Sequence, residues 1–390
     1  MEIKPKNEDT HLIYTDAPTK KTKGKHRIAK LFLLAFATAL LILSGAYFIF
    51  LRPLMQKPMA EPLKKDANPQ KTLIVEYHLM PQEEKPKQLE EIAFPKHLEV
   101  PPLFLEAIAE TDQGESSPVC GEQQALVFLL VGLDTRNDNY QSGLADVIRL
   151  VRIDFVKQEI NMIALPRDMM IDFPEGRVDL ENPMKINQAW SVGVSDWAGY
   201  KGGGNGAHSL AEAIDYNFGV EVDHYMVVNF KLVMGVIDAV GGIDVYLPYE
   251  VHDDYFGDYP SGFQHLDGLE SLVLMRIRTK YSDDFRVGNQ TIVLKALFER
   301  MKRPEMVLKI PTLVKQFREN VLTDLSAEQL ISLGHCLMNK FESEDINAKQ
   351  FTKNHITASR EFIPSVGFDL FVYLWDDEAI RFIHNTLMGK

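Results

Sequence analysis

The hydrophobic pattern of the chain begins with one uninterrupted apolar stretch close to the N-terminus. Residues 31–51 read LFLLAFATALLILSGAYFIFL, which is 21 consecutive positions without a charged side chain. A helix rises about 1.5 Å per residue, so a helix of this length matches a hydrocarbon core roughly 30 Å thick. A buried core helix would have a polar flank, which this stretch lacks. The pattern therefore predicts a transmembrane helix over residues 31–51.

The charges next to this stretch predict its orientation. Residues 20–30 contain six Lys or Arg and no acidic residue, and such an excess keeps the preceding segment in the cytoplasm. A cleaved signal peptide would have a shorter apolar core followed by small residues, whereas Arg52 and Pro53 follow here. We therefore expect a single-pass protein of the cell membrane, with residues 1–30 as a basic cytoplasmic tail and the C-terminal part extracytoplasmic.

The segment after the apolar stretch has the composition of a linker. Residues 52–118 contain ten of the chain's 20 prolines, mixed with Lys, Glu and Gln. This composition favours extended chain over a packed core. We predict a Pro-rich extracytoplasmic linker over residues 52–118 and a folded domain over residues 119–390. Cys120 and Cys336 could form a disulfide in an exported domain, and the sequence leaves this open.

Beyond residue 120 the pattern alternates between short apolar runs and helical spacing. Strands are predicted at residues 125–134, 147–154, 159–165, 224–229, 243–248 and 368–375. Helices are predicted at residues 185–193, 208–218, 230–240, 287–302, 326–339 and 376–387. Such alternation predicts a single α/β domain, of three-layer type, with a central mixed sheet.

Charge and motif content narrow the possible functions. The chain carries 42 Lys or Arg against 55 Asp or Glu, a net charge of −13. Residues 1–30 carry +4, which leaves −17 on the remainder. A surface of this sign repels polyanions, so nucleic acid is not expected as a partner. The sequence also contains neither an HExxH zinc motif nor a GxSxG nucleophile elbow.

Basic residues at the ends of predicted elements are candidates for phosphate binding. The planar guanidinium of arginine matches phosphate oxygens and keeps its charge when partly buried. Taken singly, each such residue is more often part of a surface ion pair. Together they indicate a phosphate-binding set, which consists of Arg136, Arg167, Lys185, Arg276, Arg278 and Arg286.

Two carboxylates could add a metal site. Asp134 ends the first predicted strand and Asp146 begins the next, so both can face one pocket at the sheet edge. Mg²⁺ usually takes one or two carboxylates together with substrate phosphates and water. The metal would neutralise a diphosphate and polarise its phosphorus. The alternative is that both residues cap loops or pair with arginines.

Eight segments in order resemble the LytR-CpsA-Psr (LCP) family, whose domain is also called the cell envelope-related transcriptional attenuator domain. The segments are VFLLVGLDTR (127–136), ADVIRLVRID (145–154), INMIALPRDMMIDFP (160–174), KINQAWSVG (185–193), VDHYMVVNF (222–230), VIDAVGGIDVYLP (236–248), HLDGLESLVLMRIR (265–278) and FRVGNQ (285–290). The resemblance is strong over residues 125–320. A short cytoplasmic tail, one membrane helix and an external domain are also the usual layout of the family.

The resemblance implies a function and roles for the candidate residues. Members of the family are Mg²⁺-dependent phosphotransferases that move a glycan polymer from a polyprenyl-diphosphate carrier onto peptidoglycan through a phosphodiester bond. By motif, Asp134 and Asp146 are implied as catalytic, metal-side carboxylates, and Arg167 as the residue that stabilises the transition state. The implied diphosphate-binding set is Arg136, Arg167, Arg276, Arg278 and Arg286, with Lys185 as an addition. Asp168 is expected to orient Arg167.

Departures from the family pattern leave alternatives open. Ala145 and Val147 flank Asp146 where the family often has Ser and Thr, and Asn289 stands where an arginine usually precedes the glutamine. A polyprenyl tail would also need a deep apolar groove, which the strand at 125–133 and its covering helices could line. The rival functions are a polyprenyl-diphosphate phosphohydrolase and a non-catalytic protein that binds lipid-linked glycan.

Overall fold

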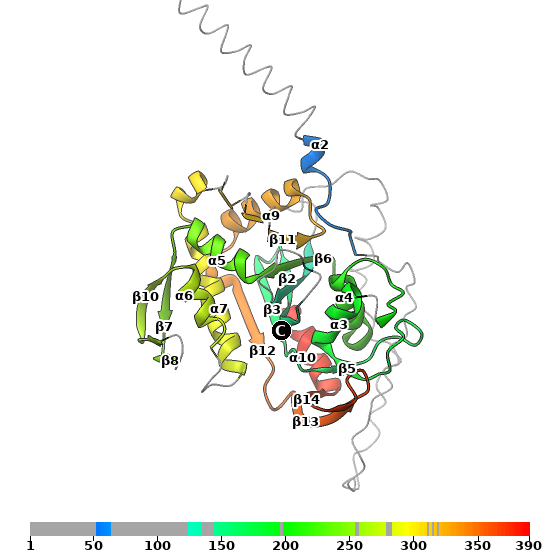
Figure 1. Ribbon diagram of the computed structural model, residues 1–390. Helices are drawn as coiled ribbons and strands as arrows, with labels where there is room; N and C mark the ends of the chain where they lie inside the picture. The colour runs from blue at the N-terminus through cyan, green and yellow to red at the C-terminus, as the bar shows by residue number, and fades with distance from the viewer. Residues whose placement is uncertain are drawn as a thin grey trace, which may run out of the picture. The chain divides into compact units, whose positions relative to one another are not determined.

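The computed structural model describes residues 52–63, 124–134, 140, 143–195, 198–253, 257–277, 283–309, 312–313, 316–317 and 320–390 (Figure 1). The predicted transmembrane helix at 31–51, the linker residues 64–118, Arg136 and Arg278 lie outside this part. Within it, no helix has both the length and the apolar character needed to cross a membrane. The chain divides into two units, residues 1–55, which contain the short helix α2 (Arg52–Met55), and residues 56–390.

A six-stranded sheet forms the centre of the larger unit. Its strand order is β11-β6-β1-β2-β3-β12. Strand β1 pairs antiparallel with β2 and parallel with β6, β2 pairs antiparallel with β3, β12 runs parallel to β3, and β11 runs antiparallel to β6. The mixed sheet confirms the predicted α/β class. The strands are β1 (Ala125–Leu133), β2 (Ala145–Asp154), β3 (Glu159–Leu165), β6 (His224–Asn229), β11 (Val321–Thr323) and β12 (Ile346–Gln350).

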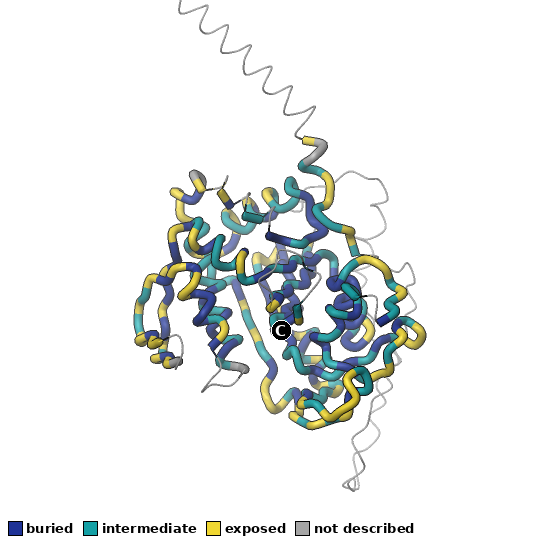
Figure 2. The backbone as a smooth tube through the Cα atoms, viewed as in Figure 1, coloured by how far each residue is buried: buried dark blue, intermediate teal, exposed yellow. Residues whose placement is uncertain are grey.

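Strand β1 is almost continuously apolar because helices cover both of its faces. Val127, Leu129 and other residues of the same parity belong to the core shared with α3 (Ile186–Val194) and α4 (Gly206–Phe218). Leu126 and Phe128, of the other parity, pack in the core shared with α9 (Ala327–Lys340) and α7 (Asp283–Met301). Figure 1 shows α3 and α4 on one side of the sheet and α7 on the other, and Figure 2 shows buried residues along the strands between them.

Local signals determine where several helices begin and end. The Asn205 side chain accepts a hydrogen bond from the N–H of Ala207 (2.8 Å) at the start of α4. The same helix ends at Gly219, whose φ of 63° is in the left-handed region that glycine adopts without a Cβ clash. Ser326 caps α9 by accepting from the N–H of Gln329 (3.2 Å), whose side chain accepts from Ser326 in return. The predicted helices are therefore confirmed to within a few residues.

The remaining elements surround the sheet. A third core lies between α5 (Phe230–Ala239), α6 (Gly268–Leu274), α7 and the hairpin β7 (Ile243–Leu247) and β10 (Gly262–Leu266). The predicted strand at 368–375 pairs with β13 (Ile356–Ile363) in a separate hairpin as β14 (Phe368–Trp375), which is followed by α10 (Asp377–Leu387). The smaller elements are β4 (Met170–Ile171), β5 (Met184–Lys185), β8 (Val251–Asp253), β9 (Gly257–Tyr259), η4 (Pro304–Lys309) and η5 (Ser343–Asp345).

Candidate functional site

A close ion pair joins two of the predicted site residues, Asp146 and Arg167. Strands β2 and β3 are antiparallel with Ile148 opposite Leu165, so the start of β2 meets the end of β3 at one edge of the sheet. The Nη1 atom of Arg167 lies 2.5 Å from Oδ1 of Asp146. Both side chains remain partly exposed, 26% for Arg167 and 20% for Asp146. The pair is therefore held in place but can still be reached by a ligand.

Asp168 connects Arg167 to Lys185. Its two carboxylate oxygens lie 3.4 Å from Nε of Arg167 and 2.7 Å from Nζ of Lys185. Lys185 reaches this position because β5 pairs with β4, with Lys185 opposite Met170. The contact agrees with an orienting role for Asp168. Two cations and two carboxylates thus alternate along this edge, and each cation is fixed by a charge-assisted hydrogen bond.

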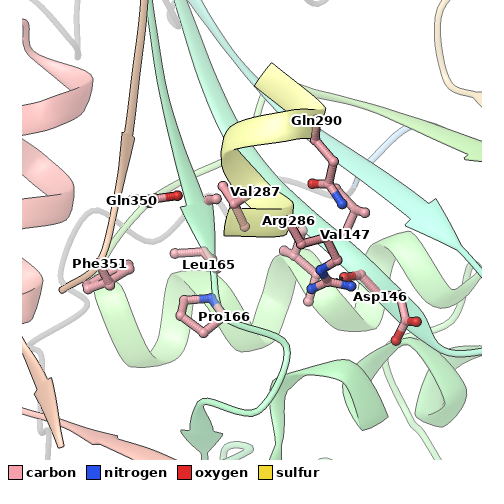
Figure 3. A pocket seen from close by; sticks show the side chains of 11 residues that line it. Asp146, Val147, Leu165, Pro166, Arg286, Val287, Gln290, Gln350 and Phe351 are labelled. Carbon is pink, nitrogen blue, oxygen red and sulfur yellow. Dashed lines mark hydrogen bonds between the residues drawn. The ribbon is translucent and has the colours of Figure 1, made fainter. Parts of the chain in front are cut away.

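Arg286 approaches the same edge from the first turns of α7. It is 5% exposed, and its Nη2 atom donates to the backbone oxygen of Asp146 (3.4 Å). Beside it lies a small cleft between the sheet edge and α7. Figure 3 shows Arg286 and Asp146 together on one side of this cleft, with Gln350 and Phe351 on the other. The lining residues are Asp146, Val147, Ile148, Ala164, Leu165, Pro166, Arg286, Val287, Gln290, Gln350 and Phe351.

Asp134 and Arg276 form a second, looser pair. The Arg276 Nη2 atom lies 3.8 Å from Oδ1 of Asp134, and its guanidinium lies over the ring of Phe230, 4.3 Å from the centroid. Leu133 is opposite Ala145 in the β1–β2 register, and the N–H of Asp134 donates to the backbone oxygen of Leu144 (3.2 Å). Asp134 therefore lies at the sheet edge where β2 begins, next to Leu144, which precedes Asp146 by two residues.

The donor set at this edge is compatible with Mg²⁺. Asp134 and Asp146 offer oxygen ligands that remain about half and one-fifth exposed. Within the described ranges no group of three or more His, Cys, Asp and Glu side chains could enclose a metal ion by itself. A hard cation that takes one or two carboxylates and completes its shell with phosphate oxygens and water fits such a pair.

Arg149 is a buried residue next to the cleft that the sequence analysis missed. It is 4% exposed and donates to the backbone oxygen of Val287 (3.2 Å) and to Oε1 of Gln290 (3.3 Å). Its other nitrogen donates to Oγ1 of Thr291 (3.3 Å) and to Sδ of Met162 (3.4 Å). Burial, together with the positive charge of Arg286, lowers the pKa of Arg149 to about 10. The sequence did offer one signal for this residue, because Arg149 is a charged residue within the apolar strand pattern at 145–154.

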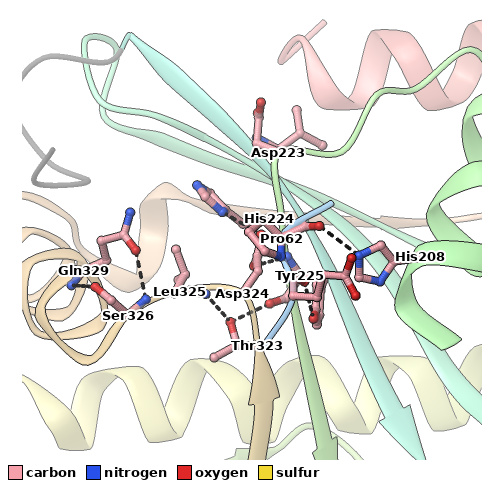
Figure 4. Close-up of polar contacts among 12 residues, drawn as sticks. Pro62, His208, Asp223, His224, Tyr225, Thr323, Asp324, Leu325, Ser326 and Gln329 are labelled. Carbon is pink, nitrogen blue, oxygen red and sulfur yellow. Dashed lines mark hydrogen bonds and ion pairs between the residues drawn. The ribbon is translucent and has the colours of Figure 1, made fainter. Parts of the chain in front are cut away.

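A second polar cluster lies away from the cleft and holds residues 56–63 on the domain (Figure 4). The Tyr225 hydroxyl donates to the backbone oxygen of Glu61 (2.8 Å), and Nε2 of His208 lies 2.9 Å from that of Pro62. Farther along, the N–H of Met59 donates to the backbone oxygen of Leu325 (3.2 Å). The sequence analysis placed these residues in the linker, whereas they pack against the folded domain.

The structure brings together part of the predicted set. Asp146, Arg167, Lys185 and Arg286 lie at one sheet edge, and Asp134 with Arg276 lies at the same edge beside β1. Arg136 and Arg278 lie outside the described residues. Cys336 is buried and disulfide-bonded.

Comparisons with known proteins agree with this architecture. A family model described as the LytR_cpsA_psr family matches residues 105–367. The polyisoprenyl-teichoic acid–peptidoglycan teichoic acid transferase TagV of Bacillus subtilis (strain 168) is 26% identical over 233 residues, 58% of this chain and 56% of TagV. TagU of Oceanobacillus iheyensis, a transferase of the same description, is 26% identical over 279 residues, 71% of this chain and 79% of TagU.

A solved structure supports the fold. The crystal structure of B. subtilis TagV superposes with a TM-score of 0.54 at 24% identity, over 69% of this chain and 98% of that structure. The chain spans little more than half the length of the curated TagV sequence that it matches.

Proposed function

The chain belongs to the LytR-CpsA-Psr family, and from this membership we propose that it is a phosphotransferase. It moves a glycopolymer from a polyprenyl-diphosphate carrier onto peptidoglycan and forms a phosphodiester bond. The relatives TagV and TagU carry names that describe such a transfer of teichoic acid. The donor is a lipid-linked, anionic glycopolymer.

The Asp146–Arg167 contact beside Arg286 is the observation that carries the proposal. An arginine that is held by a carboxylate and remains 26% exposed keeps a fixed orientation while its positive charge stays accessible to an anionic ligand. Arg286 adds a second guanidinium at the same strand end, and Lys185 adds an ammonium group through Asp168. Charge held in place before the reaction stabilises developing negative charge without a cost of reorganisation.

The proposed reaction replaces one phosphorus–oxygen bond by another. The acceptor hydroxyl oxygen bonds to the phosphorus on the glycan side, its proton leaves to a base or to water, and the bridging P–O bond breaks. The products are the glycan phosphodiester and the polyprenyl monophosphate. Arg167 and Arg286 bind the non-bridging oxygens, whose negative charge is more spread out in the transition state. Asp146 and Asp168 keep Arg167 oriented for this contact.

We propose that Asp134 and Asp146 would hold Mg²⁺, which would neutralise diphosphate charge and polarise the reacting phosphorus. Both carboxylates lie at the strand end where the arginines converge. For the whole protein we propose a single-pass anchor at residues 31–51 and an extracytoplasmic domain, because a long polyprenyl carrier stays in the membrane.

The experiment is turnover by the full chain in detergent with a polyprenyl-diphosphate-linked glycan, Mg²⁺ and a peptidoglycan acceptor. Arg167→Lys is expected to lower kcat at least 100-fold, because lysine cannot reproduce the forked donor geometry. Asp146→Asn should cause a loss of similar size. The matched control is Arg177→Lys, since Arg177 pairs with Glu212 away from the cleft.

The products distinguish the rival functions. A phosphodiester linked to the acceptor supports transfer. Free phosphorylated glycan alone would mean that water is the acceptor and that the protein is a phosphohydrolase. Donor that binds without release of polyprenyl phosphate would make the protein a non-catalytic glycan-binding protein. Wild-type kcat in Arg167→Lys would remove this arginine from the reaction.

A further inference from the structure

Arg149 and Arg152 are buried arginines on the same strand, β2, but the groups that their guanidinium nitrogens contact differ in charge. The Nη1 atom of Arg152 lies 3.0 Å from the carboxylate of Asp154. The contacts of Arg149 with described residues instead go to uncharged acceptors, the Val287 carbonyl, the Gln290 amide, the Thr291 hydroxyl and the Met162 sulfur. A buried charge without a counter-charge is costly, so its retention calls for an explanation.

Arg149 lies directly behind residues that line the cleft, since it contacts Val287 and Gln290 but is not itself part of the lining. Val147, Arg149 and Val151 share one face of β2, because alternate residues of a strand point the same way. Val147 lines the cleft, whereas Val151 belongs to the apolar core. On α7, Val287 and Gln290 line the cleft and Leu294 packs against the same core. Arg149, which contacts Val287 and Gln290, therefore lies at the boundary between the cleft and the core.

A second guanidinium group, that of Arg286, lies next to this boundary. Arg286 lines the cleft, is as buried as Arg149, and contributes with burial to the lowered pKa of about 10 for Arg149. A group with that pKa is still protonated at neutral pH. The nearby Asp146 carboxylate is engaged by Arg167. Two guanidinium groups of like charge in a low-dielectric environment repel each other, and an anion in the cleft would reduce that repulsion.

We propose that Arg149 is a positioning residue that forms a cationic floor for the cleft. Its positive charge lies behind the cleft lining, and its hydrogen bonds hold Gln290 and the first turns of α7 in place. The cleft therefore favours a diphosphate group over an apolar chain. Because Arg149 lies where an apolar residue would join the cleft to the core, it also closes the space between β2 and α7 to a lipid tail. This inference rests on the proposed function, since it takes the donor's diphosphate as the occupant.

The test uses the full chain in detergent and inorganic pyrophosphate as the probe, with and without Mg²⁺. Calorimetric titration of Arg149→Met should show a dissociation constant at least tenfold higher than that of the wild type, with a weaker dependence on salt concentration. The thermal midpoint should stay the same or rise, because methionine replaces a buried charge beside Met162. Arg177→Met removes the same charge elsewhere and should leave pyrophosphate binding unchanged.

A purely structural role predicts different results. It would make Arg149→Met less stable, and Arg149→Lys would lose affinity as fully as the methionine variant. In our proposal Arg149→Lys keeps most of the affinity, because the charge remains, and this variant decides the matter if Arg149→Met does not fold. Wild-type affinity in folded Arg149→Met would overturn the inference alone. A wild-type protein that binds no pyrophosphate would overturn the diphosphate site of the proposed function as well.

Discussion

Three separate donors at the end of β2 stabilise the ionised carboxylate of Asp154. Its carboxylate pairs with Arg152 and accepts from the N–H groups of Lys157 (2.8 Å) and Val156 (3.1 Å). Burial raises the pKa of Asp154, but the Lys157 and Val156 amides and the Arg152 guanidinium outweigh it and hold the pKa below its ordinary value. The native state therefore favours the ionised form of this carboxylate more than the unfolded chain does.

Asp154→Asn is expected to lower the free energy of unfolding by about 2 kcal/mol at pH 7, because it leaves the Arg152 charge buried beside a weaker acceptor. The native pKa lies below the unfolded value, so this contribution is complete above about pH 4 and disappears as the pH falls below it. Urea unfolding of the full chain in detergent at pH 7 and pH 3 checks both parts. Wild type and variant should differ less at pH 3.

The control for this prediction is Asp179→Asn. Asp179 forms an exposed ion pair with Lys201 at 3.1 Å, and such a pair contributes less than about 1 kcal/mol. Equal losses from the two aspartates, or a difference between wild type and Asp154→Asn that persists at pH 3, would contradict the assignment.

The segment 56–63 behaves as an element of the domain rather than as linker. Pro58 forms an isolated bridge with Ser326, and Ala60 and Leu63 pack against the core that contains α4. Burial raises the pKa of Tyr225, whose hydroxyl donates to this segment, to about 12. These hydrogen bonds go to backbone carbonyls of the segment. The side-chain pattern of the segment therefore could not predict that it packs on the domain.

A chain that begins at residue 64 is expected to unfold at least about 5 °C below one that begins at residue 56. The shorter chain leaves the Tyr225 hydroxyl and the ring of His208 without the acceptors that they contact in this segment. Circular dichroism on heating measures the difference. Lys57→Ala in the longer chain is the control, since the side chain is exposed. Equal midpoints for the two chains would show that the segment adds no stability.

At the scale of the whole molecule, an acidic protein brings several of its cations together at one sheet edge. The chain carries a net charge of −13, yet Arg149, Arg167, Lys185 and Arg286 gather around the start of β2 and α7. A compact cluster of positive charge in an acidic protein favours a small anionic group over an extended polyanion.

Removal of divalent metal is expected to abolish turnover by the full chain, and Mg²⁺ should restore it. Asp134→Asn should raise the Mg²⁺ concentration for half-maximal activity about tenfold, because the variant has lost one carboxylate ligand. Asp258→Asn is the control, since Asp258 pairs with His252 on an exposed hairpin. Full activity in EDTA, or identical Mg²⁺ curves for the two variants, would rule out this metal site.

The sequence indicated the fold best where a segment's own pattern is sufficient. The strands at 125–134 and 159–165 differ from β1 and β3 by no more than one residue, because an apolar run bounded by turn residues is a local signal. Strand β12 reads INAKQ and escaped prediction. Its alternating burial is that of an edge strand, and its partner β3 lies far away in the sequence.

For the site, the sequence by itself determined which groups carry charge and that several of them end strands or begin helices. The tertiary structure decided the distances. The β2–β3 register places Asp146 against Arg167, the short pairing of β4 with β5 delivers Lys185 to Asp168, and α7 gives Arg149 uncharged partners. Periodicity follows from burial of one segment, whereas a contact between distant residues depends on how whole elements pack. Only that packing shows that Arg152 is paired with the Asp154 carboxylate, whereas Arg149 contacts uncharged groups of α7.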